Sequence, residues 1–381
     1  MIGTSVIGDP VARAGGVLTI DLGAVAANWR LLTSRLRPGC RAAAVVKADA
    51  YGLGAAGVAP TLWNAGCRRF FVATLDEGLA LRPIVPDAEI FVFNGPFPGT
   101  EADFLAAGLL PVLNSPQQVA GWAALAQPGL PLAAALHVDT GMSRLGLTMP
   151  EAAGLAADAD LRRRVPLCLI SSHLACADDP DLPMNRRQLL AFAAARRLFP
   201  GVEGSLAASS GIFLGQDYHA DWVRPGAALY GLRPTPKSPN PMAPVVRLQG
   251  RILQVRDVDA GDTVGYGATH RATRRSRLAT VAAGYADGLF RSLGNRGFAH
   301  VGDKRVPLVG RVSMDLVVFD VTGVGEDEVG PGRLIDLIGP ANTADDVAAA
   351  AGTIGYEVLA ALGRRFHRRY LGEADSSGGR T

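Results

Sequence analysis

Lysine is scarce in this chain of 381 residues. Of its 38 basic residues only Lys47, Lys237 and Lys304 are lysine, and the other 35 are arginine. No run of like charge exceeds the three residues of Arg162 to Arg164, and the net charge is only +3. These absences argue against a basic surface for nucleic acid or for an anionic membrane.

Cysteine is equally rare, with four residues at positions 40, 67, 168 and 176. They form no C-x-x-C pair and have no histidine cluster nearby, so we expect reduced core thiols, no metal site and a cytosolic protein. The first sixteen residues contain no continuous apolar segment, which predicts neither a signal peptide nor a membrane span. The chain has no P-loop and no H-E-x-x-H, so nucleotide and zinc chemistry find no support.

The composition is that of a globular protein, with 48% hydrophobic and 19% charged residues, and the length allows two domains. Over the first 230 residues, apolar runs alternate with helix-like stretches such as 24–36, 116–126 and 183–199. The expected strands begin at Val17, Arg41, Phe70, Glu89, Leu109, Leu132, Leu167 and Ser205, with a further extended piece around 227–230. This alternation predicts an α/β fold, a (β/α)8 TIM barrel.

The carboxyl ends of the strands hold the active site of such a barrel, and Lys47, Asp139, His173 and Ser209 fall at these ends. The proline-rich stretch 234–244 predicts a domain boundary. Beyond it, β-rich segments predict a mainly antiparallel β domain, closed by helical pieces from Thr343 and Thr353. We therefore expect a leader over 1–16, a barrel over 17–240, a β-rich domain over 241–370 and a flexible tail over 371–381.

Lys47 stands in an apolar run of alanine and valine and is followed by an aspartate, a tyrosine and two glycines, in VVKADAYGLG. A lysine at the end of a buried strand can snorkel into solvent. Alternatively, burial can lower its pKa and make it a base or a Schiff-base nucleophile. On residue type alone the first alternative is favoured.

Six further segments carry polar residues at turns: HVDTGMSRLG from His137, SSHLACADD from Ser171, SLAASSGIF from Ser205, VRPGAALYG from Val223, AAGYADGLFR from Ala282 and GRVSMDL from Gly310. TIGYEV from Thr353 adds a tyrosine. Each has a structural explanation of its own: Arg144 could brace a loop, His173 could be a satisfied core histidine and Tyr285 could pack in a turn. The small residues of SLAASSGIF predict a strand that runs into a helix N-terminus, which favours phosphate.

Together with VVKADAYGLG, these ordered motifs resemble the alanine racemase family over residues 17 to 370. The resemblance implies pyridoxal 5'-phosphate (PLP) as cofactor, with Lys47 as its Schiff-base lysine. It gives the phosphate to Tyr51, Ser210, Tyr356 and the backbone at Gly226 and Ala227, and the pyridine nitrogen to Arg224, with His173 in a relay beside it. Arg144 would contact the cofactor and the substrate carboxylate, the backbone at Met314 would bind that carboxylate too, and Arg311 would line the entrance.

The activity implied is a two-base interconversion of L- and D-alanine, with Lys47 and Tyr285 as catalytic bases on opposite faces. The resemblance further implies a cytoplasmic homodimer that shares its active sites and supplies D-alanine for peptidoglycan. His137 stands where some family members have a carbamylated lysine that orients the arginine, so we expect an anion or His137 itself to position Arg144. Ser209 replaces a frequent asparagine, and Ser313 a frequent cysteine.

Three other functions remain open from the residues. A broader amino-acid racemase or a decarboxylase would use the same barrel and β domain. A non-catalytic PLP carrier protein would resemble the barrel alone, and Tyr285 argues against it because a carrier has no use for that residue.

Overall fold

A computed structural model describes residues 9–127 and 131–372. The remaining parts of the predicted leader and tail, 1–8 and 373–381, lie outside the described residues. The described chain divides into two compact units, one of residues 25–243 and one that combines residues 9–24 with 244–372. The division at 243/244 falls in the proline-rich stretch.

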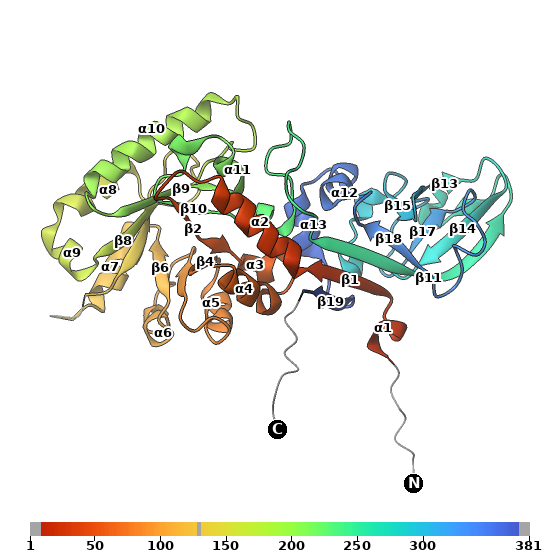
Figure 1. Cartoon of the computed structure of the whole chain (residues 1–381), viewed down its shortest axis with the longest axis horizontal. Coiled ribbons are helices and arrows are strands. Elements are labelled where there is room, and N and C mark those ends of the chain that lie inside the picture. Colours follow the sequence, from red (N-terminus) through yellow and green to blue (C-terminus); the bar gives the residue numbers. More distant parts are fainter. Residues whose placement is uncertain (1–8, 128–130, 373–381) are drawn as a thin grey trace, which may run out of the picture. The chain divides into compact units, whose positions relative to one another are not determined.

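The unit of residues 25–243 is a ring of parallel strands with helices around it (Figure 1). Its strand segments follow the order β2-β10-β9-β8-β7-β6-β5-β4-β3, and every neighbouring pair is parallel. The predicted barrel is therefore confirmed. The segments are β2 (Arg41–Ala42), β3 (Ala44–Val45), β4 (Arg69–Val72), β5 (Glu89–Val92), β6 (Leu110–Leu113), β7 (Ala134–His137), β8 (Leu167–Ser171), β9 (Glu203–Ala208) and β10 (Trp222–Arg224).

Two of these segments, β2 and β3, are halves of one extended run interrupted at Ala43. The first half pairs with β10 and the second with β4, and the N–H of Ala43 donates to the carbonyl of Val223 at 2.9 Å. Nine segments thus make eight strand positions, and the ring closes on itself without a free edge. The alanines of the run are buried, as expected for a strand covered on both faces.

Helices link the barrel strands, and the three expected helices are found within two residues of their predicted ends. The longer ones are α2 (Leu22–Ser34), α4 (Ala55–Asn64), α5 (Leu75–Leu81), α6 (Glu101–Ala106), α7 (Pro116–Ala124), α8 (Met149–Ala157), α9 (Ala159–Arg164) and α10 (Pro183–Leu198). Shorter ones are α3 (Lys47–Tyr51), α11 (Ser209–Ile212), η1 (Gln216–Tyr218) and η2 (Ala227–Tyr230). Both α5 and α8 begin with a capping box, Thr74 with Glu77 and Thr148 with Glu151.

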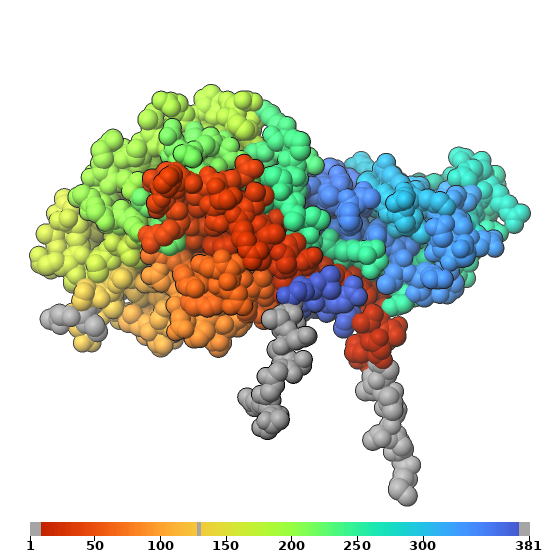
Figure 2. Space-filling view, viewed as in Figure 1, coloured from red at the N-terminus to blue at the C-terminus, as the bar shows by residue number. Residues whose placement is uncertain are grey.

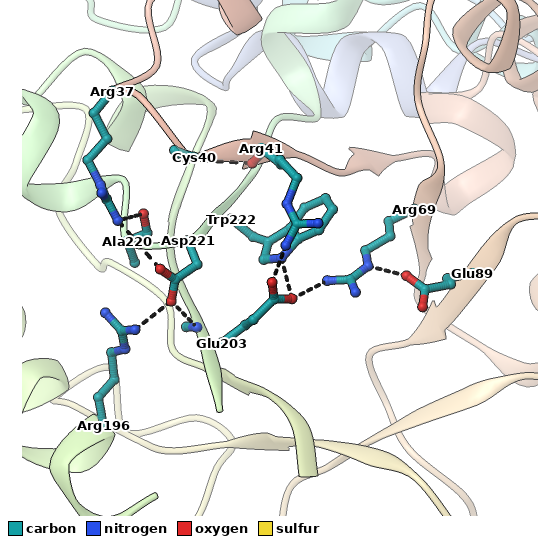
Figure 3. Close-up of polar contacts among 11 residues, drawn as sticks. Arg37, Cys40, Arg41, Arg69, Glu89, Arg196, Glu203, Ala220, Asp221 and Trp222 are labelled. Carbon is teal, nitrogen blue, oxygen red and sulfur yellow. Dashed lines mark hydrogen bonds and ion pairs between the residues drawn. The ribbon is translucent and has the colours of Figure 1, made fainter. Parts of the chain in front are cut away.

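The amino-terminal end of the ring is tied by a charge network (Figure 3). Glu203 accepts hydrogen bonds from Arg41, from Arg69 at 3.0 Å and from the indole N–H of Trp222 at 2.7 Å, and Arg69 also pairs with Glu89. The guanidinium carbons of Arg41 and Arg69 lie 4.1 and 3.9 Å from the centre of the Trp222 ring. Arg41 begins β2 and Arg69 begins β4, while Glu203 and Trp222 begin β9 and β10. The network therefore joins the first and last strands of the barrel at the end away from Lys47.

The second unit is a mainly antiparallel sheet, as predicted. Its strands follow the order β16-β15-β18-β11-β1-β19, with β14 paired to β11 and to β17, and a separate pair β12-β13. The strands are β1 (Gly16–Asp21), β11 (Val246–Val258), β12 (Thr263–Val264), β13 (His270–Arg271), β14 (Ser276–Val281), β15 (Phe298–Val301), β16 (Lys304–Pro307), β17 (Val317–Asp320), β18 (Leu334–Ile338) and β19 (His367–Leu371). Its helices are α1 (Pro10–Arg13), η3 (Tyr266–Ala268), η4 (Tyr285–Asp287), η5 (Arg291–Leu293), α12 (Ala344–Ala351) and α13 (Gly355–Ala361).

Two predicted strands of the barrel were wrong. The strand from Val17 is not a barrel strand: β1 pairs antiparallel with β11 and parallel with β19 in the second unit, where Figure 2 shows the red and dark-blue segments side by side. The extended piece expected at 227–230 is the 3-10 helix η2, and the eighth strand is β10. Both runs are apolar and buried, and apolarity alone does not reveal the partner or the backbone conformation.

The ends of the described chain also differ from the prediction. Part of the expected leader is ordered, because α1 precedes β1 and Arg251 donates to the carbonyls of Val11 and Ala14 at 2.7 and 2.8 Å. The tail was predicted to start at Leu371, which is the last residue of β19. Among the described residues, no helix combines the length and the apolarity needed to cross a membrane.

Candidate active site

Lys47 lies at the carboxyl end of the first barrel strand, two residues after β3. The four residues that follow, Ala48 to Tyr51, all adopt left-handed backbone angles, with φ between 51° and 56°. The N–H of Gly52 closes the turn on the carbonyl of Ala48 at 2.7 Å. Residues with a Cβ rarely adopt this conformation, so the turn after Lys47 is strained and is held by its surroundings.

The amine of Lys47 is half-buried, and its Nζ lies 5.8 Å from the centre of the Phe93 ring. Burial lowers the pKa of Lys47, the positive charge of Arg144 lowers it further, and Glu77 raises it in part. A lowered pKa increases the uncharged fraction of the amine, which is the form that acts as nucleophile or base.

Tyr51 is buried at the end of the left-handed turn, with its ring centre 4.8 Å from that of Tyr230. The hydroxyl of Tyr230 donates to the carbonyl of Val45 at 2.9 Å, which fixes that ring in turn. A Cβ at Gly226 would lie only 2.4 Å from the hydroxyl oxygen of Tyr51. The backbone of Gly226 can therefore approach Tyr51 only because glycine has no side chain.

The β9 strand ends at a pair of serines. The Oγ of Ser209 accepts hydrogen bonds from the N–H groups of Gly226 and Ala228, at 3.0 and 3.1 Å, so it holds the chain that follows β10. Ser210 follows as a half-buried residue. The helix expected here is α11, a single turn of four residues.

Arg224 is buried in the barrel and donates to the hydroxyl of Ser205 and, at 2.5 Å, to the carbonyl of Ser172. Burial lowers the pKa of Arg224 to about 10, so it stays charged at neutral pH. His173 follows β8, and burial together with Arg224 lowers the pKa of His173 to about 3. This histidine is therefore neutral at physiological pH.

The loop after β7 carries Arg144 as an exposed side chain. It is shaped by Asp139, whose carboxylate accepts backbone hydrogen bonds from the three residues 141–143 at 2.8 to 3.2 Å. The Nδ1 of His137 pairs with the hydroxyl of Ser171 at 3.2 Å, and in the part of the chain that the structure describes no hydrogen bond joins His137 to Arg144. Burial lowers the pKa of His137 to about 4.

The predicted site residues of the second unit lie on neighbouring turns. The N–H groups of Tyr285 and Ala286 donate to the carbonyls of Ser313 and Met314, both at 3.0 Å. A Cβ at Gly284 would lie 2.2 Å from the carbonyl oxygen of Met314, so the two turns touch along their backbones. Tyr285 is 44% and Met314 54% exposed.

An ion pair between the buried Asp287 and the exposed Arg365 supports the turn of Tyr285. The carboxylate of Asp287 accepts two hydrogen bonds from Arg365, at 2.6 and 2.7 Å, and one from the N–H of Gly284 at 2.9 Å. Tyr356 belongs to the first turn of α13 and is 37% exposed. Arg311 packs over the backbone of Gly267, where an added Cβ would lie 3.1 Å from its guanidinium.

The barrel site thus combines a lysine of lowered pKa, a buried tyrosine packed against a glycine backbone and a buried charged arginine. A lysine of lowered pKa can act as a nucleophile toward a carbonyl group, and a charged arginine can donate to a fixed acceptor. Within residues 9–127 and 131–372, no group of three or more His, Cys, Asp or Glu side chains is arranged to hold a metal ion.

Comparison with known families agrees with this chemistry. The model of the alanine racemase N-terminal domain matches residues 20–234, and that of the C-terminal domain matches residues 245–370. The chain belongs to the alanine racemase family. An alanine racemase of Rhodospirillum rubrum is 53% identical over 368 residues, which cover 96% of this chain and 98% of that protein. A protein of Agrobacterium fabrum named as a catabolic alanine racemase is 50% identical over 360 residues, which cover 94% of this chain and 92% of that protein.

Solved structures of the family share the fold. The alanine racemase of Bartonella henselae, with covalently bound PLP, superposes with a TM-score of 0.90 at 39% identity and covers 94% of this chain and 100% of that one. The biosynthetic alanine racemase of Pseudomonas aeruginosa gives a TM-score of 0.87 at 34% identity, with 94% of this chain and 99% of the other covered.

The predicted site residues fall in both units of the chain. Lys47, Asp139, His173 and Ser209 lie at the carboxyl ends of barrel strands as expected, and Tyr285 lies beside Met314 in the second unit. The roles of the individual residues stay predictions. Sequence reasoning missed Glu77, whose carboxylate contacts the chain after Lys47, and it left the side chain of Ser209 without a role. The capping-box spacing of Thr74 and Glu77 could have pointed to a role for Glu77.

Proposed function

We propose that this chain is a PLP-dependent alanine racemase that interconverts L- and D-alanine with two bases. The single observation that carries the proposal is Lys47, half-buried and with a lowered pKa, at the end of a barrel strand and followed directly by a turn that buries Tyr51 against Gly226. The family membership and the covalently bound PLP of the Bartonella henselae relative support it.

Lys47, Tyr51, Arg224, Gly226 and Ala227 would hold the cofactor, together with Ser210, Tyr356 and Arg144. When bound, PLP would supply an aldehyde that reacts with an amino group and a conjugated ring that draws electrons from the substrate Cα. Arg224 stays charged at neutral pH, so it would donate a hydrogen bond to the ring nitrogen without transferring a proton. A donor of this kind disfavours transamination and favours removal and return of a single proton.

Tyr285 would take the Cα proton of L-alanine from one face, and Lys47 would return a proton to the other. For D-alanine the two exchange roles. A tyrosine is a weak base at neutral pH, so nearby positive charge must assist it. We propose Arg224 for this support, through His173, and Arg144 with the backbone at Met314 for the substrate carboxylate.

We further propose that Tyr285 is supplied by a second copy of the chain, in a homodimer that shares its active sites. The D-alanine produced would serve peptidoglycan synthesis in the cytoplasm. All four cysteines are free, in keeping with a reducing compartment.

The test is to incubate the purified protein with L-alanine in deuterated water and to follow optical rotation and Cα deuteration together. We expect racemisation with deuteration and no release of ammonia, pyruvate or carbon dioxide. Release of carbon dioxide would indicate a decarboxylase, and racemisation of many amino acids a broader enzyme. Bound cofactor with unchanged alanine would refute the proposed substrate.

Two variants test the assignment of the bases. Tyr285→Phe should slow proton removal from L-alanine far more than from D-alanine in the exchange assay, and equal effects would remove the assignment of the faces. Lys47→Ala should lose covalent attachment of PLP, which mass spectrometry after borohydride reduction detects. A reduced PLP adduct at another residue of Lys47→Ala, at the level seen in the unchanged protein, would refute Lys47 as the anchor.

A further inference from the structure

The left-handed turn after Lys47 requires support from outside itself. Each residue with a Cβ costs about 1–2 kcal/mol in this conformation. Four such residues stand in sequence, from Ala48 to Tyr51. Three backbone hydrogen bonds of the turn, from the N–H groups of residues 50, 52 and 54 at 2.7 to 2.9 Å, offset only part of a cost of this size. Some other group must therefore hold the turn.

The carboxylate of Glu77 contacts this turn at its first residue. Its Oε1 accepts the N–H of Ala48 at 2.6 Å, and that N–H belongs to the peptide bond that leaves Lys47. Its Oε2 accepts the N–H groups of Ala73 at 2.7 Å and Thr74 at 3.3 Å, at the beginning of α5. One half-buried carboxylate thus ties the end of the first barrel strand to the end of β4.

We propose that Glu77 is a positioning residue for Lys47: its carboxylate fixes the peptide plane after Lys47 and so aims the amine into the site. The proposal rests on the proposed function, since it assumes that Lys47 is the reacting lysine. Glu77 acts through the backbone of Ala48 and does not need to touch substrate or cofactor.

The charge of Glu77 has a second effect on the same lysine. Burial and Arg144 lower the pKa of Lys47, and Glu77 opposes them. Replacing the carboxylate by a neutral group must therefore lower the pKa of Lys47 further. A residue with only a structural role would leave this pKa unchanged.

Glutamine is the informative substitution. It has nearly the same shape as glutamate, but one of its two terminal atoms is an NH2 group, which cannot accept the N–H of Ala48 or of Ala73. Glu77→Gln thus loses the charge and one side of the bridge. Glu77→Asp keeps the charge but is shorter by one methylene group.

The chain offers a matched control in Glu151. It closes the capping box of α8 as Glu77 closes that of α5, and its carboxylate accepts the N–H of Thr148 at 2.8 Å. Glu151→Gln makes the same change of charge at a helix cap without touching the turn after Lys47. The effect of a weakened cap is thereby separated from the effect on Lys47.

Two measurements are compared across Glu77→Gln, Glu151→Gln and the unchanged protein. One is kcat and KM for L-alanine with PLP bound. The other is the pKa of Lys47 in cofactor-free protein, from competitive labelling of its amine at a series of pH values and mass spectrometry of the peptide. We expect Glu77→Gln to lower kcat by roughly 10- to 100-fold with a smaller change in KM, and to lower the pKa of Lys47. Glu151→Gln should change neither.

Equal results for the two glutamine variants in both measurements would overturn the proposal. If Glu77→Gln does not fold, Glu77→Asp decides: a lower kcat with an unchanged pKa of Lys47 supports the proposal, and an unchanged kcat overturns it. The labelling does not depend on racemisation. Failure of the unchanged protein to racemise alanine therefore counts against the proposed function alone, while an unchanged pKa in Glu77→Gln counts against the inference.

Discussion

Gly226→Ala tests the closest approach in the barrel site. Gly226 has φ −131°, outside the left-handed region that favours glycine, so the test concerns the space that an added methyl group would need. That methyl group would lie 2.4 Å from Tyr51 Oη, 3.0 Å from Tyr51 Cζ and 3.2 Å from the Cβ of Val45. All three contacts are shorter than ordinary van der Waals separations.

The magnitude follows from how little the neighbours can yield. Tyr51 is buried against Tyr230, and the hydroxyl of Tyr230 is bonded to Val45, so Tyr51 cannot retreat without breaking a ring contact or lifting the left-handed turn. Overpacking of this kind costs about 1–3 kcal/mol. Because both residues are predicted phosphate contacts, we also expect weaker retention of PLP.

The assay is urea unfolding followed by tryptophan fluorescence. All four tryptophans, at positions 29, 63, 122 and 222, belong to the barrel unit, so the signal reports on the barrel alone. Gly154→Ala is the matched control, since a Cβ there meets nothing within 4 Å and the residue lies inside helix α8. It should stabilise the barrel by about 0.5–1 kcal/mol.

A second substitution makes the reasoning refutable at the level of one atom. Tyr51→Phe removes the oxygen at 2.4 Å and leaves Cζ at 3.0 Å as the nearest atom, so it should recover part of the stability lost in Gly226→Ala. If Gly226→Ala unfolds at the same urea concentration as the unchanged protein, or if Tyr51→Phe adds its own loss without recovery, the close approach does not constrain this site.

Three other predictions concern the same barrel. Ser209→Ala leaves the N–H groups of Gly226 and Ala228 without their acceptor, at about 1–3 kcal/mol each; urea unfolding should show the loss, and Ser209→Asn should recover part of it. Burial alone would raise the pKa of Glu203, but the hydrogen bonds from Trp222 and Arg69 outweigh burial, and the pKa lies below its ordinary 4.5. Glu203→Gln should therefore lower the free energy of unfolding by about 1 kcal/mol at pH 7 and by progressively less as pH falls below 4.5. A loss of stability that grows in acid would contradict this. With its pKa near 3, His173 should add no inflection to the pH profile of kcat/KM between pH 5 and 8, and an inflection abolished by His173→Asn would refute its neutral state.

The barrel could be predicted because its signals are local. Runs of alanine and valine with amphipathic stretches between them indicate buried parallel strands, and Ser115 with Pro116 marks the start of α7. The strand from Val17 has the same local character, and only its pairing with β11 places it in the other unit. Pairing over such a distance in sequence is not encoded in any short window.

The sequence predicts a residue of the candidate site where a motif contains that residue. It misses a residue whose contact forms only in the tertiary structure. Lys47 and Tyr51 stand together in one motif. Glu77 lies thirty positions from Lys47 and resembles an ordinary helix cap, so its bond to Ala48 appears only in three dimensions. The hydroxyl of Ser209 likewise meets the chain after β10 only once the barrel has formed.

The place of β1 determines the order in which the two units can be completed during synthesis. This strand is made before the barrel, yet its neighbours β11 and β19 follow only after the barrel has been made. The barrel can fold as soon as it emerges, while the buried side chains of β1 wait for their partners. Deleting β1, residues 16–21, would therefore leave the barrel unit of residues 25–243 whole and remove an inner strand from the domain at the opposite end of the chain.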